Sequence, residues 1–339
     1  MADYININGN NIPIRASDPS NPIVGEIWYN STTNLLKGQA FDSIGSWSTG
    51  ASINTARQQA SDFGSTRDAL VFAGGFDPSR STATEEYNGT TFSAGGALPT
   101  VVGGAGGSGT LTAGVSFGGS NSSPGSTGQT NRTNEYNGSS WATVNNMNTA
   151  TPYRPGTGTE TNTIAAGSAV NFPGGGGGTV SEKYDGTSWT TTPSLSTARY
   201  AEDVGTGSSA LAIGGQNTGS TVTNVVESWN DTSWSSSPAL NQNHGGHGKT
   251  GTDDTAALIW GGGTTDPLTA NPTVQTESWD GVSWTSLPSQ ANLPTGVTYP
   301  ASTGTQSAAI SAGGNPPTGV TTATNLFDQG PITVTISSS

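Results

Sequence analysis

Short apolar segments that end in glycine recur along this 339-residue chain, and polar stretches rich in Ser, Thr, Asn and Gly separate them. Short apolar runs bounded by turn residues are typical of buried β-strands. Five copies end in two glycines and a sixth, variant copy ends in one, at residues 69–75, 115–119, 164–167 (the variant), 211–215, 258–262 and 310–314. The pattern therefore predicts six buried strands, one in each of six repeats.

A second pattern follows each apolar segment, in which two aromatic residues lie five positions apart around a polar turn. The pairs are Tyr87 and Phe92, Tyr136 and Trp141, Tyr184 and Trp189, Trp229 and Trp234, and Trp279 and Trp284, and Phe327 begins a degenerate sixth copy. Two residues before each leading aromatic stand Glu85, Asn134, Glu182, Glu227, Glu277 and Asn325. From Glu85 to Asn325 the five steps average 48 residues, which is the length of a four-stranded propeller blade. Because the acid recurs from repeat to repeat, we interpret it as a structural hydrogen-bonding position.

The turn between the paired aromatics contains Asn-Gly or Asp-Gly in four copies, as in Asn88-Gly89 and Asp185-Gly186. These dipeptides favour the positive φ angles of a type I′ turn, so the aromatics are expected on adjacent strands of a hairpin. An earlier glycine followed by Thr or Ser marks the turn between the first two strands of each repeat. These glycines are Gly64, Gly109, Gly156, Gly205, Gly251 and Gly304. Each repeat thus predicts four strands, and the first of them is rich in small residues, which suit a crowded axis.

The whole pattern predicts an all-β fold, a six-bladed β-propeller over residues 46–330. The double glycine followed by spaced aromatics resembles the kelch family, although the aromatic spacing here is one residue shorter. The last repeat has no second aromatic, whereas Trp47 near the start has no repeat of its own. We therefore expect the strand around Trp47 to complete the last blade and close the ring, which would leave no free sheet edge.

Residues 1–45 lie outside the repeats and predict a short attachment segment. Its β-hairpin pairs residues 25–30 with 35–37 around a polar turn, and Trp28 and Tyr29 are expected to be exposed for a partner surface. This hairpin, with residues 18–22 before it, resembles the N-terminal modules of tail and capsid-associated proteins of marine bacteriophages, particularly cyanophages. The C-terminal residues 331–339 predict a strand or tail that competes with the Trp47 strand or adds a fifth strand to the last blade.

Composition narrows the function. The chain has no cysteine, which excludes disulfides and thiolate chemistry, and no apolar run approaches the roughly 18 residues of a membrane helix. A net charge of −13 with only ten Lys and Arg residues argues against a nucleic-acid partner. The resemblance to phage proteins implies a virion location, an oligomeric arrangement in the particle and other virion proteins as partners.

Candidate binding residues lie in the links between repeats: Tyr153, Arg154, Arg199, Tyr200 and Tyr299. Antiparallel connectivity places these links on the same face as the longer connections near 76–83, 120–131, 168–179, 216–223, 263–274 and 315–322. Aromatic rings beside hydrogen-bonding side chains suit host surface glycans. The alternative is that these residues cap the core where repeats meet.

Enzymatic functions are disfavoured. His244 and His247 are the only histidines, and together with Asp253 or Asp254 they resemble zinc ligands, but a glycine-rich loop does not preorganise them. We therefore predict no catalytic residues, no metal and no cofactor. The expected function is a non-enzymatic structural or binding component of a phage virion, in a tail, fibre or capsid decoration. A glycan-cleaving depolymerase and a free-standing lectin remain the alternatives.

Overall fold

The computed structural model describes residues 12–23, 25–41, 44–76, 78–121, 128–169, 177–217 and 219–336. These residues form an all-β structure in which the one helix is the 3-10 helix η1 (Ser289–Ala291). Parts of the long connections expected near 76–83, 120–131, 168–179 and 216–223 lie outside the described residues. The chain divides into two compact units, one of Ser46–Phe327 and one that joins Met1–Gly45 to Asp328–Ser339.

The larger unit contains, in its described part, six four-stranded antiparallel sheets that follow one another along the chain. The first three comprise β5 (Ser61–Thr66), β6 (Ala69–Ala73), β7 (Thr84–Tyr87) and β8 (Phe92–Ala94); β9 (Gly106–Thr110), β10 (Ala113–Phe117), β11 (Thr133–Tyr136) and β12 (Trp141–Val144); and β13 (Thr157–Thr159), β14 (Asn162–Ala169), β15 (Gly177–Tyr184) and β16 (Trp189–Thr192). The other three comprise β17 (Arg199–Thr206), β18 (Ser209–Asn217), β19 (Val226–Trp229) and β20 (Trp234–Ser237); β21 (Gly248–Asp253), β22 (Ala256–Trp260), β23 (Thr276–Trp279) and β24 (Trp284–Ser286); and β25 (Ala301–Thr305), β26 (Ala308–Ala312), β27 (Thr324–Asp328) and β4 (Ser46–Thr49).

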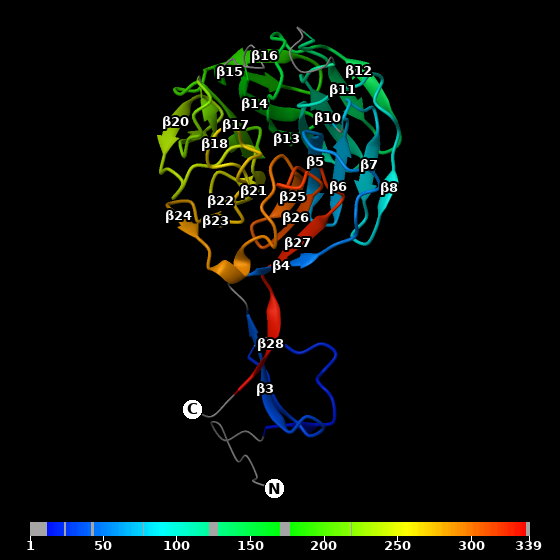
Figure 1. Ribbon diagram of the computed structural model, residues 1–339, viewed down its shortest axis with the longest axis vertical. Coiled ribbons are helices and arrows are strands. Elements are labelled where there is room, and N and C mark those ends of the chain that lie inside the picture. The colour runs from blue at the N-terminus through cyan, green and yellow to red at the C-terminus, as the bar shows by residue number, and fades with distance from the viewer. Residues whose placement is uncertain are drawn as a thin grey trace. The chain divides into compact units, whose positions relative to one another are not determined.

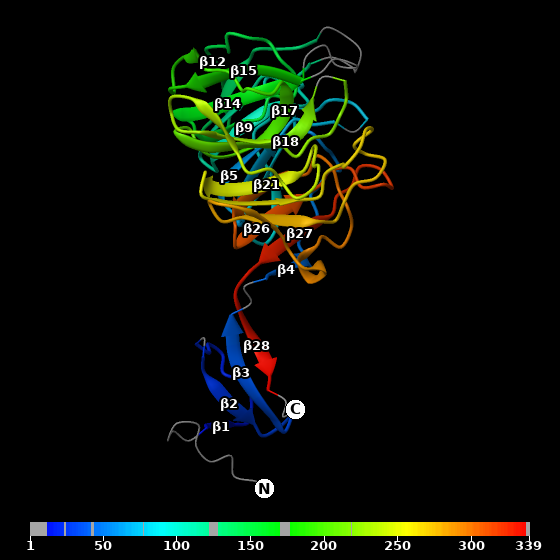
Figure 2. The same cartoon turned by 90° about the vertical axis from the view of Figure 1, so that its left-hand side faces the viewer.

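These sheets are arranged around a common centre (Figure 1). Their first strands contact one another in chain order, from β5 through β9, β13, β17 and β21 to β25, and β25 contacts β5 again. In the second view, β17, β21 and β26 of three successive sheets appear as successive layers (Figure 2). The unit is therefore propeller-like, with the first strand of every sheet at its axis.

The strand around Trp47 pairs as the sequence predicts. It is β4, the outer strand of the sheet that β25, β26 and β27 begin. The Gly50 N–H donates to the Thr324 carbonyl at 2.8 Å, and the Trp47 ring lies 5.2 Å from Phe327 and 5.0 Å from Trp260. Residues from the two ends of the unit thus share one sheet and one aromatic cluster.

The hairpins between the third and fourth strands differ from the predicted type I′ turns. Tyr87 and Phe92 are direct partners in the ladder, so the loop has four residues rather than the two of a type I′ turn. Asn88 keeps a negative φ, and only Gly89 is left-handed, at +90°. The Asn88 Oδ1 accepts the N–H groups of Thr90 and Thr91, at 3.0 and 2.9 Å. The side chain, not a second positive φ, therefore stabilises this turn.

The second aromatic of a repeat ties its sheet to the previous one. Four of these tryptophans donate their Nε1–H to a hydroxyl at an equivalent position in the third strand of the neighbouring sheet: Trp141 to Thr84, Trp189 to Thr133, Trp234 to Ser181 and Trp47 to Thr276. Between two other pairs of neighbouring sheets, the described residues do not form this hydrogen bond. Trp284 Nε1 is buried without an acceptor, because Val226 replaces the hydroxyl residue, and the buried Thr324 Oγ1 lacks a partner, because Phe92 replaces the tryptophan.

We expect Val226→Thr to stabilise the protein by about 1 kcal/mol, because it gives the buried Trp284 donor the acceptor that the other junctions have. Urea denaturation of the variant and the parent measures the gain. The control is the same change in a Trp284→Phe background, which has no donor to satisfy, so the gain should vanish there. An equal gain in both backgrounds would show that the hydrogen bond is not its source.

The smaller unit is a four-stranded sheet in the order β1 (Ile14–Arg15), β2 (Ile27–Asn30), β3 (Leu35–Phe41) and β28 (Pro331–Thr335), labelled in Figure 2. The strands β2 and β3 form an antiparallel hairpin, and β1 is parallel to β2. The C-terminal strand β28 pairs with β3 from Pro331 opposite Phe41 to Thr335 opposite Lys37. It therefore neither competes with β4 nor extends the last sheet, contrary to the prediction.

Candidate functional site

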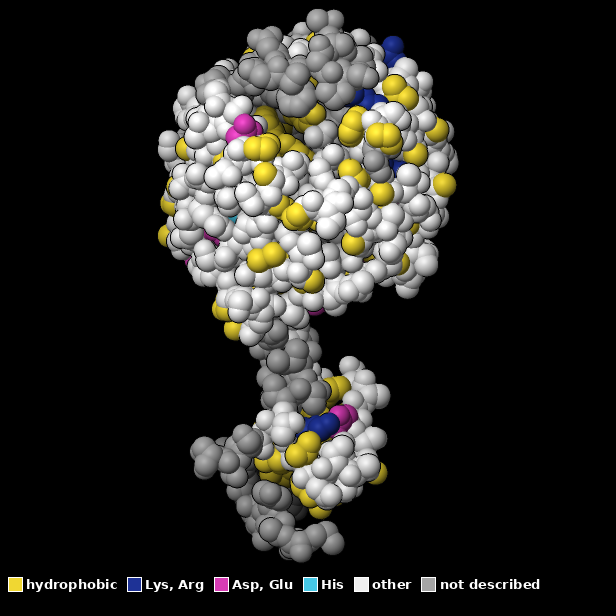
Figure 3. All heavy atoms as spheres, viewed as in Figure 1, with side chains coloured by type: hydrophobic (Ala, Val, Ile, Leu, Met, Phe, Trp, Pro, Cys, Tyr) yellow, Lys and Arg dark blue, Asp and Glu magenta, His cyan; other side chains and the backbone are white. Residues whose placement is uncertain are grey.

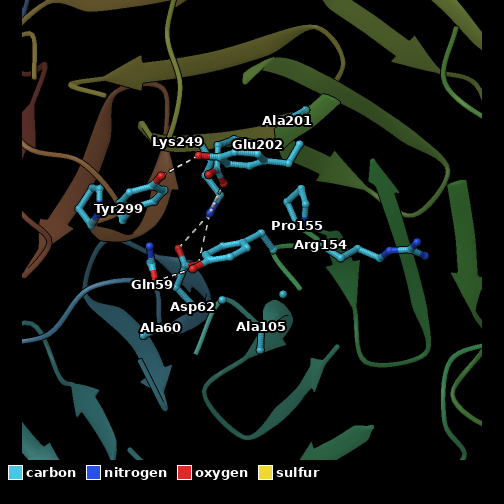
Figure 4. A pocket seen from close by; sticks show the side chains of 15 residues that line it. Gln59, Ala60, Asp62, Ala105, Arg154, Pro155, Ala201, Glu202, Lys249 and Tyr299 are labelled. Carbon is cyan, nitrogen blue, oxygen red and sulfur yellow. Dashed lines mark hydrogen bonds and ion pairs between the residues drawn. The ribbon is translucent and has the colours of Figure 1, made fainter. Parts of the chain in front are cut away.

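The largest concentration of candidate residues lies in a pocket on the axis of the larger unit, at the end where the links between sheets meet (Figure 4). The pocket has about 500 Å³ of empty space, counting the part open to solvent. Short bridges such as Gln58 to Phe76 and Thr298 to Asn315 pair these links with the long connections. The links and the long connections therefore share one face, as the connectivity predicts.

Three tyrosines from three different repeats line this pocket: Tyr153, Tyr200 and Tyr299. The hydroxyls of Tyr200 and Tyr299 are 2.7 Å apart and share a hydrogen bond, and the Tyr153 hydroxyl donates to Gln59 Oε1 at 3.1 Å. The rings of Tyr153 and Tyr200 lie 5.9 Å apart at 38°. Burial raises the pKa of all three phenols, so they are neutral at physiological pH. The structure thus brings together the three tyrosines chosen from the sequence.

The backbone of the links positions two of these tyrosines, Tyr153 and Tyr299. Gln59, Tyr153 and Tyr299 all have left-handed φ angles, of 56°, 48° and 53°. Their N–H groups and that of Gly104 connect one link to the next: Tyr299 donates to the Gly246 carbonyl, Gln59 to Tyr299, Gly104 to Gln59 and Tyr153 to Gly104. Four of these five residues, Gln59, Gly104, Tyr153 and Tyr299, line the pocket. Non-glycine residues in this region are strained, and such strain commonly marks functional positions.

The floor of the pocket carries three charged side chains that the sequence did not single out. Lys249 Nζ lies 3.2 Å from Asp62 and 3.2 Å from Glu202, and the three side chains are at most 15 % exposed. Burial alone would lower the pKa of Lys249, but the two carboxylates raise it above its ordinary value. Burial raises the pKa of Glu202, while Lys249 opposes this. Lys249 therefore stays an ammonium ion, which is a poor nucleophile.

The two arginines chosen from the sequence do not face a ligand, and this corrects their assignment. Arg154 Nη1 lies 2.9 Å from Glu182, Arg199 Nη1 lies 2.6 Å from Glu227, and all four side chains are fully buried. Figure 4 shows the Arg154 side chain leading away from the tyrosines. The two arginines follow the alternative interpretation, in which link residues cap the core.

The same contact between the recurring acid and a basic side chain occurs in two further repeats. Arg57 pairs with Glu85 at 3.0 Å, and His244 Nε2 lies 3.3 Å from Glu277. Each of these glutamates also accepts two backbone N–H groups of the link before its sheet; Glu227, for example, accepts those of Ser196 and Thr197. The recurring acid is therefore a structural hydrogen-bonding position, as the repeat predicts. The two repeats with asparagine at this position, Asn134 and Asn325, have no basic residue in the corresponding link.

The structure also differs from the expectation that Trp28 and Tyr29 are exposed attachment residues. Trp28 is fully buried within the smaller unit, and its Nε1–H donates to Asp18 at 3.0 Å, so it is not an exposed contact residue. Tyr29 is half-buried, and its hydroxyl donates to Asn34 at 3.2 Å. Among the described residues of this unit, the exposed large apolar side chains are instead Ile14, Ile23, Leu35 and Ile336. The sequence predicts the hairpin, but it does not show which face of the hairpin other residues cover. The burial of Trp28 therefore could not be predicted.

The histidines occupy a buried junction rather than a flexible loop. His244 and His247 are at most 1 % exposed, and their rings lie 5.8 Å apart. In the part of the chain that the structure describes, no three His, Asp or Glu side chains come together as metal ligands do. No helix there is long and apolar enough to span a membrane.

The pocket thus combines aromatic walls with a carboxylate-rich floor. Aromatic faces pack against the C–H faces of sugar rings, and carboxylates accept hydrogen bonds from neighbouring hydroxyls. One feature of the sequence could have indicated the three charged residues of the floor. The first strand of a repeat consists of small residues at 106–109 and 301–304, whereas Asp62, Glu202 and Lys249 lie in the equivalent strands of three other repeats. A charge in a strand that is otherwise built of small residues marks a departure from the repeat.

Comparison with known proteins supports the fold. No family model matches the chain. No curated protein matches it either. A solved structure described as the structure of YjhT is similar, with a TM-score of 0.65 over 85 % of this chain and 97 % of that chain. At 14 % identity this similarity extends to the propeller-like fold alone.

Proposed function

We propose that this chain is a non-enzymatic, glycan-binding component of a bacteriophage particle, in which a six-bladed propeller carries the binding pocket. The six sheets of the larger unit are its blades, and β4 closes the ring. The observation that carries the binding function is the convergence of Tyr153, Tyr200 and Tyr299 over the floor that Asp62, Glu202 and Lys249 form. Neutral phenols and fixed carboxylates suit a ligand rich in hydroxyl groups.

The surroundings of the pocket support a surface ligand. The face of the larger unit that Figure 3 presents carries few charged side chains, and most of its visible atoms belong to the backbone or to side chains that are neither charged nor hydrophobic. Only 10 % of the whole chain is charged. Because few charges surround the pocket, specificity would come from contacts at short range.

Tyr153→Ala should lower the affinity for host surface polysaccharide by about tenfold, because it removes one aromatic wall, worth roughly 1.4 kcal/mol of binding free energy. Binding is measured by interferometry on immobilised polysaccharide from the host, and Tyr29→Ala in the smaller unit is the matched control. Equal binding by the parent and both variants would show that the pocket does not bind the polysaccharide. Release of reducing ends during incubation, abolished by Glu202→Gln, would favour the depolymerase instead.

The particle location rests on the smaller unit and on the resemblance of residues 18–37 to phage modules. We propose that this unit attaches the protein to other virion proteins, as an oligomer in the assembled particle. Its sheet draws on both ends of the chain, since β28 pairs with β3. Removing residues 1–40 alone would therefore leave β28 without its partner strand.

A variant without residues 1–44 and 329–339 should keep the propeller folded but be absent from purified particles. The hydrophobic clusters described for the larger unit lie wholly within residues 46–327, so we expect its core to persist without the removed segments, whereas the attachment surface is lost. Quantitative mass spectrometry of purified virions measures its copy number beside the full chain. Incorporation at the normal copy number would contradict attachment through this unit.

A further inference from the structure

We propose that the axial pocket selects saccharides that carry a free ammonium group, such as a hexosamine that is not N-acetylated. The inference rests on the glycan-binding function proposed above and adds the chemical class of the ligand. It follows from the charges, the hydrogen-bonding capacity and the aromatic faces of the pocket.

The pocket holds more negative than positive charge. Of the described charged residues that line it, Asp62 and Glu202 place carboxylates and Lys249 places one ammonium at the floor, while the guanidinium of Arg154 is engaged with Glu182. Arg80 interacts electrostatically with Tyr153 but does not line the pocket. Two carboxylates of the described lining therefore share a single cation.

Glu202 is the carboxylate with spare capacity. Asp62 Oδ2 accepts hydrogen bonds from the backbone N–H and the hydroxyl of Ser302, at 2.8 and 3.1 Å, and both Asp62 oxygens lie 3.2 Å from Lys249. The side chain of Glu202, in contrast, has Lys249 as its described partner, through Oε2. Burial makes the charged form of Glu202 costly, as its raised pKa reflects. A second ammonium beside Glu202 would balance the two carboxylates.

The aromatic walls favour the same ligand. Tyrosine faces attract cations, and aromatic cages are a general solution for ammonium recognition. The mutual hydrogen bond of Tyr200 and Tyr299 fixes their rings, so they are in place before a ligand arrives. A uronic acid or a sugar phosphate would instead bring a third negative group towards Asp62 and Glu202, where the low dielectric strengthens repulsion.

Ligand-observed NMR titration of the full chain tests the inference with glucosamine, glucose, N-acetylglucosamine and glucuronic acid at neutral pH and low salt. Glucosamine should bind about tenfold more tightly than the other three. Glu202→Gln should remove that preference, so that glucosamine binds no more tightly than glucose. Glu160→Gln, a partly exposed acid outside the pocket, is the matched control and should keep the preference of the parent.

The outcomes separate this inference from the function on which it rests. Equal binding of glucose and glucosamine, or tighter binding of glucuronic acid, would overturn the ammonium preference and leave glycan binding in place. A preference for glucosamine that persists in Glu202→Gln would also overturn it. If neither these sugars nor host polysaccharide bind a protein that is folded by circular dichroism, the proposed function itself fails.

Discussion

Replacing Glu227 with alanine should destabilise the propeller-like unit by about 3–5 kcal/mol, the usual cost of removing one partner of a buried ion pair. Arg199 would keep its guanidinium in a fully buried site without a counter-charge. The N–H groups of Ser196 and Thr197 would lose their acceptors in the same step. Burial by itself raises the pKa of Glu227, yet the hydrogen bonds from Arg199 and Ser196 lower it overall, which shows that the ionised form is the one stabilised.

Urea denaturation followed by tryptophan fluorescence measures this loss, and Glu160→Ala provides the control on a partly exposed acid. The double variant Glu227→Ala with Arg199→Met should regain part of the stability, because it no longer buries a lone charge. A cost below about 1 kcal/mol for Glu227→Ala would mean that water reaches the guanidinium, and that the junction is not held by this pair.

The second large effect is expected at the double glycines. Gly215 has a φ of +98°, and a Cβ at this residue would lie 1.9 Å from the Tyr200 carbonyl oxygen. Gly215→Ala therefore combines a strained backbone with a clash against the backbone of the neighbouring strand, and should cost about 4 kcal/mol or more. Because Tyr200 lines the pocket, weaker ligand binding should accompany the loss of stability.

Gly319→Ala is the matched control for this substitution. Gly319 has a similar φ of +103°, but a Cβ there would meet no atom within 4 Å. It should cost only the backbone strain, about 1 kcal/mol. Thermal denaturation of both variants distinguishes the two contributions. Equal losses would show that the strand positions adjust freely around residue 215, and that close approach does not explain why paired glycines recur along the chain.

The repeat made much of the fold predictable, because each strand signal appears several times. The apolar segments, the aromatic pairs and the position of Trp47 all describe local strands whose neighbours follow from the repeat. Glu182 and Glu227 were also identifiable as structural, since a residue that recurs in equivalent positions meets equivalent partners. The sequence also held a signal against the binding role predicted for Arg199, because Thr-Ala-Arg appears at 55–57 and again at 197–199.

The remaining features depend on packing that no single repeat encodes. Asp62 and Lys249 are 187 positions apart and meet only because the first strands converge on one axis. Trp28 reads as an exposed aromatic until β28 and Asp18 are placed beside its hairpin. Arg199 and Tyr200 are adjacent in the sequence, yet one side chain enters the junction and the other the pocket. The periodicity of the sequence does not show which of these two side chains enters the junction and which enters the pocket.

The pairing of β4 with β27 has a consequence for synthesis of the protein on the ribosome. The Ser48 hydroxyl donates to the Leu326 carbonyl, so a strand made early waits for one that is made 278 positions later. At typical elongation rates of about 5–20 residues per second, that interval is roughly 15–55 s. During it, the nascent chain presents an incomplete array with open strand edges. Translation arrested before β27 would yield a product that cannot close, and such fragments should aggregate or be degraded rather than accumulate.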